Sequence, residues 1–192
     1  MIMGYKVPVG LSNKHLHVSS ADLEKLFGKG YKLTFSKALK QPGQFACEEK
    51  VDIVGPKGTL KGVRILGPER PETQVELSFT DARAIGVTLP IRESGKLEGT
   101  PGVKLIGPAG EVDLDHGAIV ALRHIHLSPA QAEEAGVKDK QVVSVRFGGE
   151  RAVVYENVLI RSGEGHTDEI HLDTDEGNAA GLSNGDLGEI II

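Results

Sequence analysis

Two His-x-His triplets in this chain have the residue type and the spacing of metal ligands. His15 and His17 lie in the segment SNKHLHVSSADLEKL, and His124 and His126 lie in the similar segment ALRHIHLSPAQAEEA. In an extended strand, side chains two positions apart point to the same side, so each triplet offers two imidazoles to one point. Neutral imidazole is a good ligand for zinc and its first-row neighbours. An isolated histidine is often an ordinary core or surface residue, but two triplets with matching neighbours favour metal binding.

A second internal match supplies a third candidate ligand to each triplet. The segment TQVELSFTDARAIGV at 73–87 resembles DEIHLDTDEGNAAGL at 168–182, and this match aligns Glu76 with His171. Both segments alternate polar and apolar residues, a pattern typical of half-buried strands. We interpret the chain as an internal duplication that keeps one ligand set in each half. The sets are His15, His17 and Glu76 in the first half, and His124, His126 and His171 in the second.

The number of ligands in each set favours an enzyme. Structural zinc sites usually have four protein ligands, commonly cysteines, whereas catalytic zinc sites have three and keep one position open. Cys47 is the only cysteine of the chain, which excludes a cysteine-rich structural site. An open metal position binds water, a thiolate, or a carbonyl or phosphoryl oxygen. A mixed ligand set that draws on both halves would fit the sequence equally well.

Short apolar runs between glycine and proline turns predict the strands that carry these ligands. The chain has 25 glycines and 9 prolines, and its aromatic content is 4%, which is typical of short elements joined by many turns. Two GPxG segments, at 55–58 and 107–110, predict hairpins or tight turns. The predicted strand segments are VDIVG, GVRILG, TQVELS, GVKLIG, VVSVRF and AVVYENVLIR.

Helix signals are few and short. Ser128, Pro129 and Gln131 have the types and spacing of an N-cap, a first-turn proline and a capping-box partner. Further short helices are predicted from Ser19 or Ser20 through ADLEKLF, at 80–85 and at 176–180. The predicted fold class is mainly β, with two small β-barrels related by internal duplication and capped by short α-helices. PIRESGKLEGTPG, at 90–102, is the most linker-like stretch.

Composition excludes several classes of partner. The net charge of −5 and the pI of about 5.8 argue against a general nucleic-acid-binding surface. No stretch is apolar and long enough to span a membrane, and the first residues, MIMGYKVPVG, do not form a signal peptide. A single cysteine allows no intrachain disulfide, which fits a reducing compartment. We predict a soluble, intracellular protein, with a homodimer as the default expectation for its assembly.

Several basic and polar residues are candidates for binding an anionic substrate. Arg70 follows the Gly67-Pro68 break, and its guanidinium could hold a phosphate with two parallel hydrogen bonds near the first metal. A solvated arginine at the rim of the site is an equally weighted alternative. Lys57 and Arg64 form a basic strip that leads toward Arg70 in sequence, and Asn178 follows His171 on a short helix.

Other polar residues receive structural interpretations. Asp173 is a helix-capping residue rather than a partner that orients an imidazole, and Arg123 points away from the ligand face. Cys47 is a small packed residue rather than an acyl-carrying nucleophile, because no activating base lies near it in sequence. His116 and His166 lie in turns without a matching partner and are left out of both ligand sets.

Five segments together resemble the PduL-type phosphate propanoyltransferases, also called phosphotransacylases. They match in order over nearly the whole chain: VPVGLSNKHLH, QPGQFACEE, LGPERPETQVELS, ALRHIHLSP and EIHLDTDEGNAAGL. The resemblance implies interconversion of acyl-CoA plus phosphate with acyl-phosphate plus free CoA, with two zinc-class ions. It implies one ion on His15, His17 and Glu76, the other on His124, His126 and His171, phosphate on Arg70, and CoA near Ser12, Lys57, Arg64 and Asn178.

The resemblance also implies a domain arrangement and a location. It implies two β-barrels, with the first strand exchanged into the barrel of the C-terminal half. The expected domains are 14–121, and 122–192 together with the N-terminal strand 4–13. Many members carry an N-terminal extension that directs them into bacterial microcompartments, whereas this sequence starts a few residues before the first motif. We therefore expect a cytoplasmic protein rather than one in a microcompartment lumen.

The expected mechanism is direct attack of phosphate on the thioester of acetyl- or propionyl-CoA, assisted by metal ions. A dinuclear hydrolase would use the same ligands to activate water. A cupin-like metalloenzyme also combines these ligand types, but typically with the glutamate close to the histidine pair, whereas Glu76 is far from His17 in sequence. A non-catalytic metal-binding protein is the third alternative.

Overall fold

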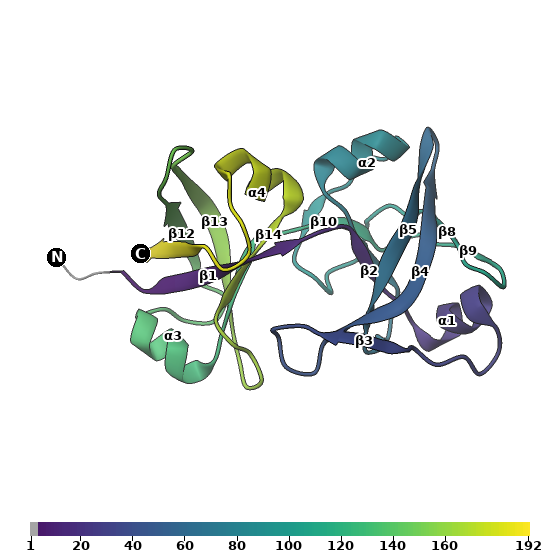
Figure 1. Ribbon diagram of the computed structural model, residues 1–192, viewed down its shortest axis with the longest axis horizontal. Helices are drawn as coiled ribbons and strands as arrows, with labels where there is room; N and C mark the ends of the chain where they lie inside the picture. Colours follow the sequence, from purple (N-terminus) through teal and green to yellow (C-terminus); the bar gives the residue numbers. More distant parts are fainter. Residues whose placement is uncertain (1–3) are drawn as a thin grey trace. The chain divides into compact units, whose positions relative to one another are not determined.

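The computed structural model describes residues 4–192, and it confirms a mainly β fold with four short helices (Figure 1). The chain divides into two compact units. The C-terminal unit comprises residues 4–12, the segment Lys40–Pro42 and Leu122–Ile192. The N-terminal unit comprises Asn13–Leu39 and Gly43–Ala121. Each element below belongs to one of these units.

The C-terminal unit is a closed barrel of six strands. Its spatial order is β1 (Lys6–Ser12), β14 (Glu169–Asp173), β11 (His124–Leu127), β13 (Val153–Ser162), β12 (Val142–Phe147) and β15 (Leu187–Ile191). The first strand closes this barrel, because β1 pairs in parallel with β14 and antiparallel with β15. Apolar side chains from all six strands fill the interior, among them Val7, Ile125, Val145, Ile160, Ile170 and Ile190.

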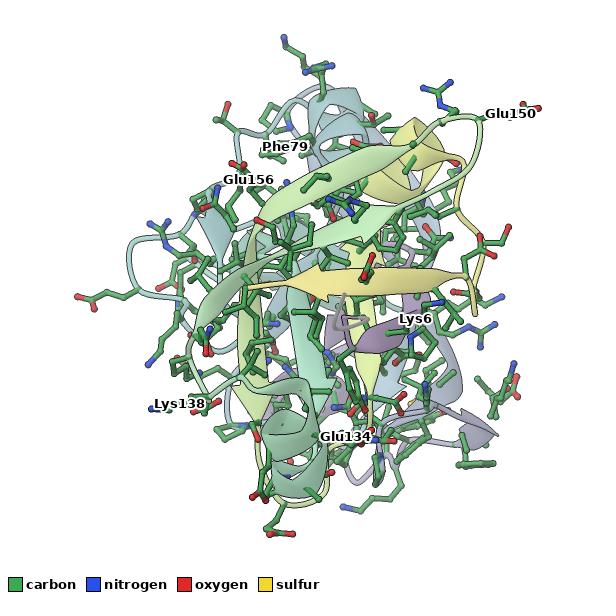
Figure 2. All side chains as sticks on the ribbon, turned by 90° about the vertical axis from the view of Figure 1, so that its left-hand side faces the viewer. Lys6, Phe79, Glu134, Lys138, Glu150 and Glu156 are labelled. Carbon is green, nitrogen blue, oxygen red and sulfur yellow. The ribbon has the colours of Figure 1, made fainter. Side chains whose placement is uncertain are left out.

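Two helices follow the barrel strands that carry candidate ligands. Helix α3 (Pro129–Ala135) begins after β11 with the predicted capping box, in which Ser128 and Gln131 exchange side-chain-to-backbone hydrogen bonds. Helix α4 (Thr174–Ala180) begins after β14 with a second capping box, formed by Asp173 and Glu176. Figure 2 shows the exposed side chains of Lys138, after α3, and Glu150, at the β12–β13 turn, extending outward from the barrel.

The N-terminal unit contains a sheet of nine strands and two helices. The spatial order is β7 (Ile91–Arg92), β10 (Ala118–Ala121), β6 (Gln74–Glu76), β2 (His15–His17), β5 (Gly58–Gly67), β4 (Phe45–Gly55), β8 (Lys104–Ile106) and β9 (Glu111–Asp113), with β3 (Phe35–Ala38) paired to β4. Both GPxG segments connect antiparallel neighbours, β4 to β5 and β8 to β9, as predicted. The helices α1 (Ser20–Phe27) and α2 (Phe79–Ile85) have Ser19 and Ser78 as N-caps.

The linker-like stretch at 90–102 does not separate the two units. It lies inside the N-terminal unit, where it contributes β7 to the sheet and buries Leu97 and Thr100. The Thr100 hydroxyl donates to the Leu97 carbonyl at 2.6 Å and accepts from the Gly117 amide at 2.9 Å. The glycines of the stretch at 90–102 therefore mark turns of an ordered loop rather than a flexible connection.

Strand pairing follows the same plan around both triplets. In the N-terminal unit, β2 pairs in parallel with β5 and antiparallel with β6, which places His15 opposite Glu76. In the C-terminal unit, β11 pairs in parallel with β13 and antiparallel with β14, which places His124 opposite His171. Within residues 4–192, no helix is long and apolar enough to cross a membrane.

Candidate metal centres

Each triplet forms a short strand whose middle residue lies in a hydrophobic core. Leu16 and Ile125 are fully buried among the apolar side chains of their own units. Because side chains alternate along a strand, this burial turns the flanking imidazoles to the opposite face. The sequence pattern therefore produces the predicted pair of convergent histidines in each unit.

The first group consists of His15, His17 and Glu76, whose candidate ligand atoms all lie within 4.8 Å of one another. His15 Nε2 is 3.5 Å from one Glu76 carboxylate oxygen, and His17 Nε2 is 3.9 Å from the other. Two ligands of one tetrahedral zinc ion with bonds of about 2.0–2.1 Å are roughly 3.3 Å apart. The donor types and their separations fit a zinc-class ion with one carboxylate and two imidazoles.

Electrostatics keeps two of the three candidate ligands of this group, His17 and Glu76, in states that suit a cation. Burial lowers the pKa of His17 to about 3, with the nearby His15 and Arg70 adding to the effect. Burial alone would raise the pKa of Glu76, but His15, His17 and Arg70 together outweigh it and hold the pKa well below its usual range. Burial alone would lower the pKa of His15, yet the Glu76 carboxylate raises it. A neutral His17 beside an ionised Glu76 is a ready cation ligand pair.

The second group consists of His124, His126 and His171, again with all candidate ligand atoms within 4.8 Å. The three rings form a nearly equilateral triangle, with centroid separations of 4.7, 4.8 and 4.9 Å. Glu169 lies at its edge, because its carboxylate is 2.6 Å from His171 Nε2. Burial, followed by the neighbouring His124 and His171, pushes the pKa of His126 far below its usual value, so this ring is neutral near pH 7.

The contact between two ring nitrogens tests whether a cation suits the second group. His124 Nε2 and His126 Nε2 are 3.1 Å apart, close to the separation of two ligands of one tetrahedral ion. The Nδ1 of His124 lies 2.8 Å from the Leu122 carbonyl oxygen, and an Nδ1–H that donates there leaves Nε2 with a lone pair. A cation that binds this lone pair and one on His126 Nε2 would satisfy the arrangement.

Backbone carbonyls orient the first group in the same way. His15 Nδ1 lies 2.8 Å from the Asn13 carbonyl oxygen, and His17 Nδ1 lies 3.1 Å from that of Leu66. Hydrogen bonds of this kind fix the tautomer of a metal-binding histidine and the direction of its ring. Both rings therefore present Nε2 toward Glu76.

The phosphate candidate Arg70 lies in the electrostatic environment of the first group. Its charge acts on the pKa of His15, His17 and Glu76. Its backbone N–H donates to the Val18 carbonyl at 2.8 Å, which fixes the residue next to β2. Its Nη1 donates to the Ser94 hydroxyl at 3.2 Å. The guanidinium is thus held beside the first ligand set by contacts that the sequence did not reveal.

Gln74 connects this arginine network to Glu76, a candidate metal ligand. Its side-chain amide donates to the Glu76 carboxylate at 2.6 Å and to the Ser94 hydroxyl at 2.8 Å, and its carbonyl oxygen accepts from the Gly95 amide at 2.8 Å. Gln74 lies opposite His17 on β6, and Glu169 lies opposite His126 at the equivalent register position of β14. In both units, the residue at this register position therefore contacts the third candidate ligand, which is Glu76 in one unit and His171 in the other.

Replacing Gln74 by alanine is expected to weaken metal binding at the first group by about 10- to 100-fold, because Glu76 loses a partner that orients its carboxylate. Metal titration followed by calorimetry measures this change, and circular dichroism checks the fold. The matched control is Gln141→Ala, since Gln141 accepts a hydrogen bond from the Lys138 amide in the C-terminal unit. Equal affinities in the Gln74 variant and the wild type would contradict this role.

His166, which the sequence analysis left out of both ligand sets, is not one of the three candidate ligands of the second group, but it contacts His126. Its Nδ1 makes a close hydrogen-bonding contact with His126 Nδ1, and the two rings are 4.5 Å apart. Burial lowers the pKa of His166, with the charge of Arg161 adding to the effect. His116, the other histidine left out, is half-exposed and pairs with Asp115 and Glu72.

The candidate CoA contacts divide between the two units. Ser12, at the end of β1, pairs in register with Asp173, and Asn178 is exposed on α4, which packs against β1. In the N-terminal unit, Lys57 lies in the turn between β4 and β5, where its amide donates to the Ile85 carbonyl. Arg64 lies far along β5 from that turn, and its guanidinium donates to the Cys47 carbonyl. The roles of Lys57 and Arg64 in CoA binding stay a prediction.

Three structural interpretations agree with the structure. Asp173 is the N-cap of α4. Arg123 forms an ion pair with Glu176 at 2.8 Å and lies 4.8 Å from the centre of the Tyr155 ring. Cys47 is fully buried, and burial raises the pKa of its thiol to about 11.

Replacing Cys47 by alanine is therefore expected to preserve turnover within about twofold, because a buried neutral thiol is not a nucleophile. Initial rates of thioester formation measure this, and a thiol reagent that reacts slowly with the folded wild type but rapidly after denaturation supports it. A loss of activity without a loss of folded protein would assign Cys47 a chemical role.

Comparison with known proteins identifies the family of the chain. The family model described as phosphate propanoyltransferase matches residues 8–183. A phosphate propanoyltransferase of Thermotoga maritima is 55% identical over 184 residues, which cover 95% of this chain and 88% of that protein. The proteins of the same name from Rhodopseudomonas palustris and Salmonella typhimurium are 52% and 50% identical, over 95% and 93% of this chain and 81% and 85% of their own lengths. The chain therefore belongs to the phosphate propanoyltransferase family of acyl-transferring enzymes.

Proposed function

We propose that this enzyme interconverts a short-chain acyl-CoA plus phosphate with an acyl-phosphate plus CoA by direct attack of phosphate on the thioester. Membership of the phosphate propanoyltransferase family supports the reaction class. The observation that carries the finer proposal is the pair of convergent three-ligand groups, one in each unit.

Two divalent ions, zinc by the chemistry of the donors, would be held by these groups: His15, His17 and Glu76 in one, and His124, His126 and His171 in the other. Such ions supply Lewis acidity, which stabilises negative charge on a carbonyl oxygen or a departing thiolate. Three protein ligands per group are the number that catalytic zinc sites use.

Arg70 would bind the phosphate. Its guanidinium has a planar set of donors that matches phosphate oxygens, and the Ser94 hydroxyl holds its Nη1. The charge of Arg70 acts on the pKa of Glu76, His15 and His17, so a positive charge lies beside the first ligand group. Arg70 thereby orients the phosphate and offsets part of its charge.

The reaction balances without a covalent enzyme intermediate. A phosphate oxygen forms a bond to the carbonyl carbon of the thioester, and the bond from that carbon to sulfur breaks. The sulfur leaves with the electron pair as the CoA thiolate, and the acyl group leaves on phosphate. Cys47, the one thiol of the chain, is buried and protonated, which supports direct transfer.

One experiment separates this function from hydrolysis. Metal-replete enzyme is mixed with acetyl- or propionyl-phosphate, with and without CoA, and thioester and free acid are both measured. We expect rapid thioester formation with CoA and little free acid without it. Release of free acid at the same rate with and without CoA would identify a hydrolase and overturn the proposal.

A further inference from the structure

The contact between His126 and His166 distinguishes one metal-binding imidazole from the other three of the triplets. For His15, His17 and His124, the Nδ1 atom faces a backbone carbonyl oxygen. For His126, Nδ1 contacts Nδ1 of His166 instead. The partner that orients this ligand is therefore a side chain, and substitution can remove it.

The loop that carries His166 is tied to the strand of the ligand it contacts. The Gly163 amide donates to the Leu127 carbonyl at 3.1 Å, directly after His126 on β11. The His166 amide donates back to the Gly163 carbonyl at 3.3 Å, which closes a turn. Gly165 has a φ of +79° within that turn, a conformation that favours glycine. This turn holds the His166 ring beside His126.

A second anchor holds the chain directly after His166. The Gln41 side chain is buried and pairs with the backbone of Thr167, donating to its carbonyl at 3.0 Å and accepting from its amide at 3.3 Å. The same amide group lies 3.4 Å from the carboxylate of Glu169, the partner of His171. Both sides of His166 are thus fixed by hydrogen bonds within the C-terminal unit.

We propose that His166 is a positioning residue for the second metal centre: its Nδ1 accepts the Nδ1–H of His126 and keeps His126 Nε2 unprotonated for the metal. This inference rests on the proposed function, in which His126 is a metal ligand. The opposite arrangement, with His166 as the donor, leaves the His126 proton on Nε2, which points at His124 Nε2 only 3.1 Å away. A proton there competes directly with the metal.

The test uses two substitutions of His166, one without and one with a hydrogen-bond acceptor. His166→Leu removes the acceptor Nδ1 and keeps a side chain of similar bulk. His166→Asn places an amide oxygen where Nδ1 lies. His116→Leu is the matched control, because His116 is a half-exposed turn histidine outside both ligand groups. Each protein is titrated with cobalt(II), and the ligand-field spectrum and the binding constants are recorded. The series is repeated with His15→Ala, which leaves the second group as the only complete one.

The leucine variant is expected to weaken one of the two cobalt-binding events by about 10- to 100-fold and to change its spectrum. The asparagine variant and the His116 control should bind both ions as the wild type does. Unchanged affinity and spectrum in His166→Leu would overturn the proposal while leaving the proposed function intact. A wild type that binds no ion at the second group would overturn both.

Ring-nitrogen NMR of the wild-type, zinc-loaded protein gives an answer even where a variant fails to fold. The expected spectrum shows His126 protonated at Nδ1 and His166 protonated at Nε2. His166 protonated at Nδ1 would contradict its role as the acceptor.

Discussion

Replacing His124 by alanine should remove one of two bound metal ions and lower turnover by about 1000-fold or more. His124 is buried, and its Nδ1 faces the Leu122 carbonyl, so its Nε2 is a fixed donor at the second group. The variant keeps two protein ligands there, one fewer than catalytic zinc sites use. Metal-ion stabilisation is worth several kcal/mol, and each 1.36 kcal/mol is a factor of ten in rate. Metal analysis of the purified variant and initial rates measure the two effects.

The control for this prediction is His116→Ala, which removes a histidine that pairs with Asp115 and Glu72 outside both groups. It should retain two ions and full activity. If His124→Ala bound one ion fewer but kept wild-type turnover, the second centre would have a structural role instead of a catalytic one.

Replacing Arg70 by alanine should lower kcat/KM for phosphate by about 100- to 1000-fold while both metal ions remain bound. Charge-assisted hydrogen bonds contribute about 1.5–3 kcal/mol each, and the guanidinium can offer two to a phosphate. Most of the loss should appear in the dependence of the rate on phosphate concentration. Arg70→Lys should recover only part of it, because an ammonium keeps the charge but lacks the planar pair of donors.

Arg83→Ala is the matched control, since Arg83 is exposed on α2 of the same unit. Its kinetics should equal those of the wild type. An Arg70→Ala enzyme with an unchanged phosphate dependence would remove Arg70 from the substrate site and leave it as a partner of Ser94.

The alternation of apolar residues and the internal repeat predicted how the strands around both triplets are arranged. Leu16 and Ile125 are buried as alternation requires, so the flanking histidines converge. The repeat aligned Glu76 with His171, and the strand register places them opposite equivalent histidines, His15 and His124. These inferences needed only local spacing and the comparison of one half with the other.

Contacts between distant segments had no comparable signal. Ser94 lies in a stretch with the composition of a linker, yet its hydroxyl contacts Arg70 and Gln74. His166 lies in a glycine turn, and only the pairing of that turn with β11 brings it to His126. Such partners depend on how loops pack against strands, which hydrophobic periodicity does not encode.

Lys57 and Arg64 remain predicted CoA contacts, and the structure describes where each lies on the β4–β5 hairpin. Lys57 and Arg64 are near each other in sequence, but the chain between them is an extended strand that rises about 3.3 Å per residue. Lys57 lies in the turn before β5, whereas Arg64 lies within β5, where its guanidinium donates to the Cys47 carbonyl.

The most direct test is to strip the enzyme of metal with a chelator and return zinc stepwise while following thioester formation from acyl-phosphate and CoA. The rate should be near zero without metal and should rise to a plateau at two zinc ions per chain. Full activity in the metal-free enzyme, or a plateau at a single ion, would contradict catalysis by two three-ligand centres.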